Sequence, residues 1–275
     1  MNKILLAFDE SSFSEGAFEF VRQLNEIQPV LLTAAFLRRA SYADMWAYAA
    51  AAGSGAVFMP VTEDKPDDTL QQVIDRFEEA CVKNGLQYRL HLDGREFSME
   101  ELKQETRFAD LLVLGSEKLY QSLHEQDQYE YLRSILHSAE CPVIVVPETF
   151  EFPTHNILAY DGSEASVFAI RQFAYILPQL AVNPTLLVYA EDDFDGRFPS
   201  ESQLVELVTQ HFPDLTLYQL ELDPRQYFHT WINDRKSPVL VAGSYSRSAF
   251  AELFRKSFVA DVIREHQVPV FIAHK

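Results

Sequence analysis

The chain has 275 residues, with 41 acidic against 23 basic side chains and a formal net charge of −18 at pH 7. This length fits one large domain or two small ones, and a hydrophobic content of 47% is enough for a packed core. Such a negative chain repels nucleic-acid phosphates and anionic lipid headgroups, so general binding to nucleic acid or to membranes is disfavoured.

Short apolar runs predict buried strands, and apolar residues at helical spacing predict helices. In the first half we expect strands at residues 3–8, 30–36, 86–92, 111–114 and 143–146. The first helix is expected to be capped by Ser11 or Ser12 and to end before Pro29. Three more helices are expected at residues 69–84, 99–108 and 129–139.

The second half repeats this alternation. Its strands are expected at residues 157–160, 185–189, 215–222, 239–242 and 270–273. Its helices are expected at residues 164–177, 200–212, 225–234 and 249–265. Strands alternating with helices predict an α/β fold, and here they predict two tandem doubly wound, five-stranded parallel sheets in place of one undivided sheet.

Three short motifs occur twice in the same order. Residues 5–11 (LLAFDES) match 157–163 (ILAYDGS), 112–116 (LVLGS) match 240–244 (LVAGS), and 141–145 (CPVIV) match 268–272 (VPVFI). Each copy is domain-sized, so we interpret the repeat as a tandem duplication, with domains at residues 1–147 and 154–275. The first copy carries an insertion at about residues 38–68, either a flap over the sheet's carboxyl edge or a variable loop on its own domain.

Ligands of open parallel sheets bind beyond the carboxyl ends of the strands, at the switch point where strand order reverses. We expect that point between the first and fourth strands of each copy, which end at Asp9 and Gly115 and at Asp161 and Gly243. An aspartate there can accept hydrogen bonds from a ribose or a base, and a Gly-Ser pair leaves the backbone open to a phosphate. The alternative is structural, because aspartate caps helices and glycine turns chains.

These motifs resemble those of the universal stress protein family, in which a strand ends in D-x-S, an apolar strand leads into G-S and the last strand reads C-P-V-[LI]-V-V. The resemblance covers nearly the whole chain as two tandem domains. It implies an adenine nucleotide alpha hydrolase-like or flavodoxin-like strand order in each domain. It also implies a pseudo-dimer in which the last strands, at residues 143–146 and 270–273, meet. Association of two copies and an unidentified protein partner are left open.

The nucleotide-binding branch of that family carries G-x-x-G, nine residues and then G-[ST]. The first copy has Lys118 at the second glycine and Tyr129-Glu130 at the last pair, whereas the second copy has Ser246 and Lys256-Ser257. Both therefore depart from the ATP-binding pattern. The candidate nucleotide contacts are Asp9, Gly115 and Ser116 in the first copy and Asp161, Gly243, Ser244, Ser246, Lys256 and Ser257 in the second.

The leading hypothesis is a cytoplasmic, non-catalytic stress-response protein with degenerate nucleotide-binding motifs and no bound cofactor. The alternative is a sensor that binds ATP or AMP in the second domain. An enzyme with weak ATPase activity ranks last, because no residue qualifies as a general base. The first apolar run is interrupted by Asp9 and Glu10, so no signal peptide is expected, and the spacing of the histidines supports no metal site.

Overall fold

The computed structural model of the chain describes residues 2–9, 12–37, 68–91, 99–117, 125–189, 198–219, 235–243 and 268–273. Apart from Asp68, the expected insertion lies outside the described residues. The helices expected at 225–234 and 249–265 also lie outside them. Everything below concerns the described ranges.

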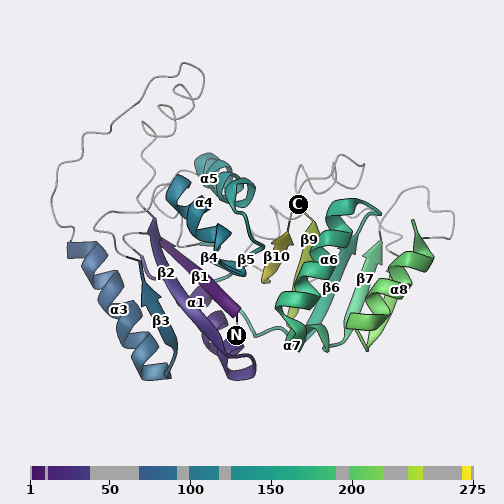
Figure 1. Cartoon of the computed structure of the whole chain (residues 1–275), viewed down its shortest axis with the longest axis horizontal. Helices are drawn as coiled ribbons and strands as arrows, with labels where there is room; N and C mark the ends of the chain where they lie inside the picture. The colour runs from purple at the N-terminus through teal and green to yellow at the C-terminus, as the bar shows by residue number, and fades with distance from the viewer. Residues whose placement is uncertain are drawn as a thin grey trace, which may run out of the picture.

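Ten strands form one sheet in the order β3-β2-β1-β4-β5-β10-β9-β6-β7-β8 (Figure 1). The strands of the first half are β1 (Asn2–Asp9), β2 (Val30–Leu37), β3 (Gln87–Leu90), β4 (Leu111–Gly115) and β5 (Val143–Val146). Those of the second half are β6 (His155–Tyr160), β7 (Thr185–Tyr189), β8 (Leu215–Gln219), β9 (Pro238–Gly243) and β10 (Val270–Ala273). All neighbours pair parallel except β5 and β10, which pair antiparallel with Phe271 opposite Ile144.

The expected pair of five-stranded parallel sheets is thereby confirmed, with one correction to their separation. The two sheets are halves of one continuous sheet, because the backbone groups of β5 and β10 bond to each other and leave no open edge between them. Within each half the strand order is 3-2-1-4-5, so the switch point lies between the first and fourth strands as expected. The flavodoxin-like order, in which the first strand neighbours the third, does not occur.

Helices cover both faces of the sheet. One face carries α1 (Glu15–Ile27), α3 (Asp68–Asn84), α6 (Glu164–Ile176) and α8 (Glu201–His211), and the other carries α4 (Met99–Arg107) and α5 (Glu125–Ser138). Alternate residues of β1 face opposite cores: Leu6 belongs to the first and Leu5 to the second. The central strands β4, β5 and β10 are buried along their whole length, whereas the edge strand β3 alternates between exposed and half-buried residues.

The start of α1 is the clearest local difference from expectation. The N-cap is Ser14, whose hydroxyl oxygen accepts a hydrogen bond from the Ala17 amide at 3.2 Å, and not Ser11 or Ser12. In the second copy the N-cap of α6 is Ser163, at the position that matches Ser11 in the repeat. A short helix α7 (Pro178–Ala181) was not predicted. Gly85, with a φ of +64°, ends α3 as expected.

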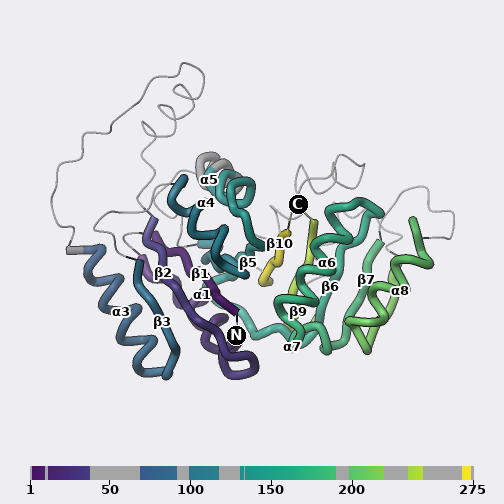
Figure 2. The backbone as a smooth tube through the Cα atoms, viewed as in Figure 1, coloured from purple at the N-terminus to yellow at the C-terminus, as the bar shows by residue number. Residues whose placement is uncertain are grey.

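The two halves also meet beside the β5–β10 pair. The backbone carbonyl of Ile176, at the end of α6, accepts hydrogen bonds from the side-chain amides of Asn2 (2.6 Å) and Gln28 (3.0 Å). Within the second half Phe173 of α6 packs edge-on against Phe271 of β10, the strand that pairs with β5, with ring centroids 5.3 Å apart. Figure 2 shows the chain crossing from one half to the other near the N-terminus. The expected meeting of the last strands is therefore part of a wider junction.

Candidate functional site

At the first switch point the chain fills the space beside Gly115. A β-carbon on Gly115 would lie 2.3 Å from the hydroxyl oxygen of Ser14, so the start of α1 packs directly on the end of β4. The neighbouring Ser116 is completely buried, and its amide donates to the carbonyl of Val146 at 2.8 Å. Asp9 is also buried, and its carbonyl accepts from the Ser12 amide. The structure thus brings these three candidate residues together, inside the packed protein.

A carboxylate lies at the N-terminus of α1, beside the end of β4, where the sequence predicts that the Gly115-Ser116 backbone is open to a phosphate. The hydroxyl of Ser14 donates to Oε1 of Glu148, and the amides of Glu15 and Gly16 donate to Oε2 at 3.1 and 3.4 Å. The first backbone amides of a helix have no intrahelical partner and carry partial positive charge, which favours an anion. Glu148 supplies this anion from the segment that follows β5.

Sequence analysis missed Glu148 because its contacts span 132 to 134 residues. The available signal was its position directly after Pro147, at the carboxyl end of the strand beside β4.

Aromatic side chains cover the carboxyl ends of β1 and β2. The Phe8 ring stacks on Phe13 with centroids 5.0 Å apart and on Phe36 at 5.7 Å. The guanidinium of Arg76 lies 5.2 Å from the centre of the Phe13 ring, and it forms an ion pair with Glu15. The first switch point is therefore filled by apolar rings and by a carboxylate, and the nearby Arg76 cation is already paired with Glu15, so little attracts a second anion.

At the second switch point the Asp161 side chain bonds to the backbone at the start of α6. Its Oδ1 accepts a hydrogen bond from the Ser163 amide at 2.9 Å, and the Ser163 hydroxyl oxygen accepts from the Ser166 amide at 3.1 Å. A β-carbon on Gly243 would lie 2.4 Å from the carbonyl carbon of Ala165, so α6 packs on the end of β9 as α1 packs on β4. Asp161 and Gly243 thus lie at the same site.

The other four candidates of the second copy, Ser244, Ser246, Lys256 and Ser257, lie outside the described residues.

A turn of the chain covers the end of β6. The Tyr160 hydroxyl donates to the carbonyl of Pro199, and a β-carbon on Gly162, whose φ is +77°, would lie 2.8 Å from the Pro199 side chain. The ring of Tyr189 lies 6.2 Å from Tyr160 and 5.6 Å from Phe198. Burial raises the pKa of Tyr160, and the charge of Asp161 adds to the effect. The phenol is therefore neutral and acts as a hydrogen-bond donor.

The cysteines offer no reactive group. Cys81 and Cys141 are buried free thiols, and desolvation raises the pKa of each to about 12. A protonated thiol is a weak nucleophile, so both are packing residues, as the sequence indicated. In the described part of the chain no cluster of His, Cys, Asp or Glu side chains could hold a metal ion. No helix within the described ranges is long and apolar enough to cross a membrane.

The comparisons with known proteins give the fold. No family model and no curated protein matches the chain. Among solved structures, a universal stress protein from Archaeoglobus fulgidus superposes with a TM-score of 0.66 at 12% identity, over 100% of this chain and 96% of that one. A protein from Pseudomonas aeruginosa, also described as a universal stress protein, gives 0.52 at 10% identity, over 100% and 93%. The resemblance expected from the motifs is thereby confirmed at the level of the fold.

Proposed function

Since the chain has the fold of the universal stress proteins, we propose that it is a cytoplasmic, non-catalytic stress-response protein in which the first domain binds no nucleotide. The observation that carries this proposal is the Glu148 carboxylate on Ser14, Glu15 and Gly16. A phosphate at the Gly115-Ser116 backbone would lie beside this carboxylate, because Glu148 Oε1 is 3.3 Å from the position of a β-carbon on Gly115, and like charges repel. The Phe8–Phe13 stack supports the same conclusion for the base.

The proposed lack of catalysis has support from the polar groups near the switch points. One carboxylate oxygen of Asp161 holds the Ser163 amide, and the Tyr160 phenol is neutral and bonded to Pro199. The two thiols are protonated at neutral pH. A general base or nucleophile would need a free basic atom beside a space for substrate, and these groups are committed to the fold.

The second candidate function is an adenine-nucleotide sensor that uses the second domain. The observation that favours it is an inequality between the copies. In the alignment of the last repeated motifs Lys275 matches Glu148, so the sequence of the second copy has a basic residue where that of the first has an acidic one; Lys275 lies outside the described residues. A basic residue at this position of the repeat favours an anionic ligand. The proposed contacts are Asp161, Gly243, Ser244, Ser246, Lys256 and Ser257.

A titration of the purified chain with ATP, AMP and cyclic AMP in the presence of Mg²⁺ distinguishes the two proposals. The non-catalytic proposal expects no heat of binding, no change in melting temperature and no turnover. One molecule of ATP per chain, lost in Ser257→Glu, supports the sensor. Binding of two ATP molecules per chain would contradict the proposal that the first domain binds no nucleotide. Steady ATP hydrolysis that persists after repurification would contradict the proposal that the chain is non-catalytic.

A further inference from the structure

The segment that joins the two halves, residues 147–154, contacts both of them; we call it the strap. In the first half its backbone lies close against α1, because a β-carbon on Gly16 would fall 2.0 Å from the Pro147 carbonyl oxygen. Further along, Phe150 and Phe152 pack on Phe20 of the same helix, with ring centroids 6.0 and 5.5 Å away. The strap is therefore seated along α1, and it is not a loose connection.

The end of the strap is fixed to the second half by hydrogen bonds, among them one from the Thr154 hydroxyl to the Lys236 carbonyl at 3.4 Å. The Ser237 hydroxyl donates to the carboxylate of Glu151, and the Thr154 amide donates to the Ser237 carbonyl at 2.9 Å. The side-chain amide of Asn183 donates to the carbonyl of Pro153 at 3.1 Å. These partners precede β7 and β9 and so belong to the body of the second half.

Glu148 fixes the beginning of the strap. Its carboxylate accepts from three groups in the first turn of α1, and its own amide donates to the carboxylate of Glu117, after β4, at 3.4 Å. Only five residues separate Glu148 from Thr154, and two of them are the packed phenylalanines. Because the segment is short and packed, a movement at one end is expected to displace the other end.

We infer that the strap couples the first switch point to the junction between the halves, with Glu148 as the residue that fastens it. Release of the Glu148 carboxylate then frees the first turn of α1 and, through the strap, loosens the contacts with Ser237 and the β5–β10 pair. The reverse also holds, because coupling between two sites is reciprocal. Loosening the Glu151 end therefore exposes the amides of Glu15 and Gly16.

Residue-resolved hydrogen exchange on the full chain tests the coupling. In Glu148→Ala the amides of Glu15 and Gly16 should exchange roughly tenfold faster, because they lose a charged acceptor. The coupling further requires faster exchange at Thr154 and in β5 and β10. The matched control is Glu79→Ala, which removes an exposed carboxylate of α3 and should leave all these amides unchanged. Acceleration confined to Glu15 and Gly16 overturns the proposal, because Glu148 would then be only a helix cap.

The reciprocal experiment starts from the exposed Glu151, whose replacement does not disturb the core. In Glu151→Ala the amides of Glu15 and Gly16 should again exchange faster, although neither touches Glu151. Unchanged exchange at both overturns the coupling, even where Glu148→Ala fails to fold. In Glu148→Ala/Glu151→Ala the two accelerations should be less than multiplicative, because either change alone already releases the strap.

Discussion

At the scale of single residues, the glycines at the switch points have a packing role that the sequence could not separate from a binding role. Both roles require the absence of a β-carbon. In the structure the atoms that approach closest belong to the chain, Ser14 at Gly115 and Ala165 at Gly243. The Gly-Ser motifs correctly predicted that another group lies close to the backbone at these glycines. That this group is the chain itself, and not a ligand, could be seen only in the structure.

We predict that Gly243→Ala destabilises the protein by about 1–3 kcal/mol, a typical cost of overpacking. The added carbon would lie 2.4 Å from the Ala165 carbonyl carbon and 2.6 Å from the Ser166 amide, and helix backbone cannot step aside as a flexible side chain can. The control is Gly85→Asn, since Gly85 has a positive φ and open space, which asparagine tolerates. Urea unfolding should show the loss in the first variant and less than about 1 kcal/mol in the second.

The buried thiols predict a loss of stability in alkaline solution. The ordinary pKa of a cysteine thiol is 9.0, whereas burial raises the pKa of Cys81 and Cys141 in the folded chain to about 12. As the pH rises from 9 toward 12 the unfolded chain loses these protons and the folded chain keeps them, so unfolding becomes easier. Each thiol contributes at most about 1.4 kcal/mol per pH unit in this window, and nothing below it.

Other groups also titrate there, so the decisive measurement is the difference between wild type and Cys141→Ala. Urea midpoints at about pH 8 and about pH 10 should fall less in the variant than in wild type. Equal falls would show that the thiol does not remain protonated in the folded state. In addition, native protein should resist thiol labelling at neutral pH and react once unfolded.

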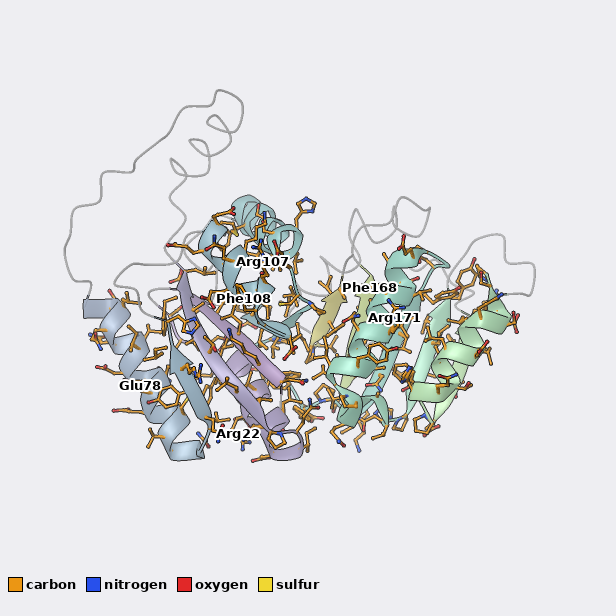
Figure 3. The ribbon with its side chains drawn as sticks, viewed as in Figure 1. Arg22, Glu78, Arg107, Phe108, Phe168 and Arg171 are labelled. Atoms are coloured by element: carbon orange, nitrogen blue, oxygen red, sulfur yellow. The ribbon has the colours of Figure 1, made fainter. Side chains whose placement is uncertain are left out.

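At the scale of elements, α6 stabilises the second half through one face only. Phe173 is completely buried between Phe212 and Phe271, with ring centroids 6.5 and 5.3 Å away. Phe168 is partly buried and packs against the same core, and the exposed Arg171 lies over its ring at 5.8 Å (Figure 3). Tyr175 is more than half exposed, with an edge contact to a histidine.

We therefore predict that Phe173→Ala costs about 3–5 kcal/mol, because it leaves a cavity at the junction of α6 and β10. Tyr175→Ala, on the same helix two residues later, should cost less than about 1 kcal/mol. Both values can be read from urea unfolding followed by circular dichroism. Similar losses of stability in the two variants would mean that the exposed face of α6 contributes as much to stability as its buried face.

Most elements could be predicted from the sequence because their signal is local. The runs of β5 and β10 are apolar throughout and β7 is apolar after Thr185, and the bounds of all three strands were predicted to the residue. The start of α1 was wrong because Ser11, Ser12 and Ser14 are all suitable caps. The choice among them depends on Gly115 and Glu148, more than 100 residues away. Tertiary contacts of this kind leave no periodicity that a sequence pattern can reveal.

At the scale of the whole molecule, the pairing of the two halves explains the shape of the sheet. The last strand of a lone domain would present an open apolar edge, and antiparallel pairing of β5 with β10 covers both such edges. Among the described strands, β3 and β8 form the two edges of the sheet. In β3 the exposed residues are Gln87 and Arg89, and a charged edge opposes further strand addition.

We predict that the chain is a monomer of 31.5 kDa in solution. The apolar strands β5 and β10 are already paired with each other, and the net charge of −18 repels a second copy. Light scattering coupled to size exclusion should give this mass at low salt. It should give the same mass at about 1 M salt, where charge repulsion is screened and an apolar interface would show itself. A doubled mass only at high salt would mean that charge alone keeps the chains apart. A doubled mass at both salt concentrations would contradict the prediction and mean that two chains associate through a surface other than β5 and β10. The variant Arg89→Asp, which changes an exposed residue of the edge strand β3, would then test whether that surface includes this edge of the sheet.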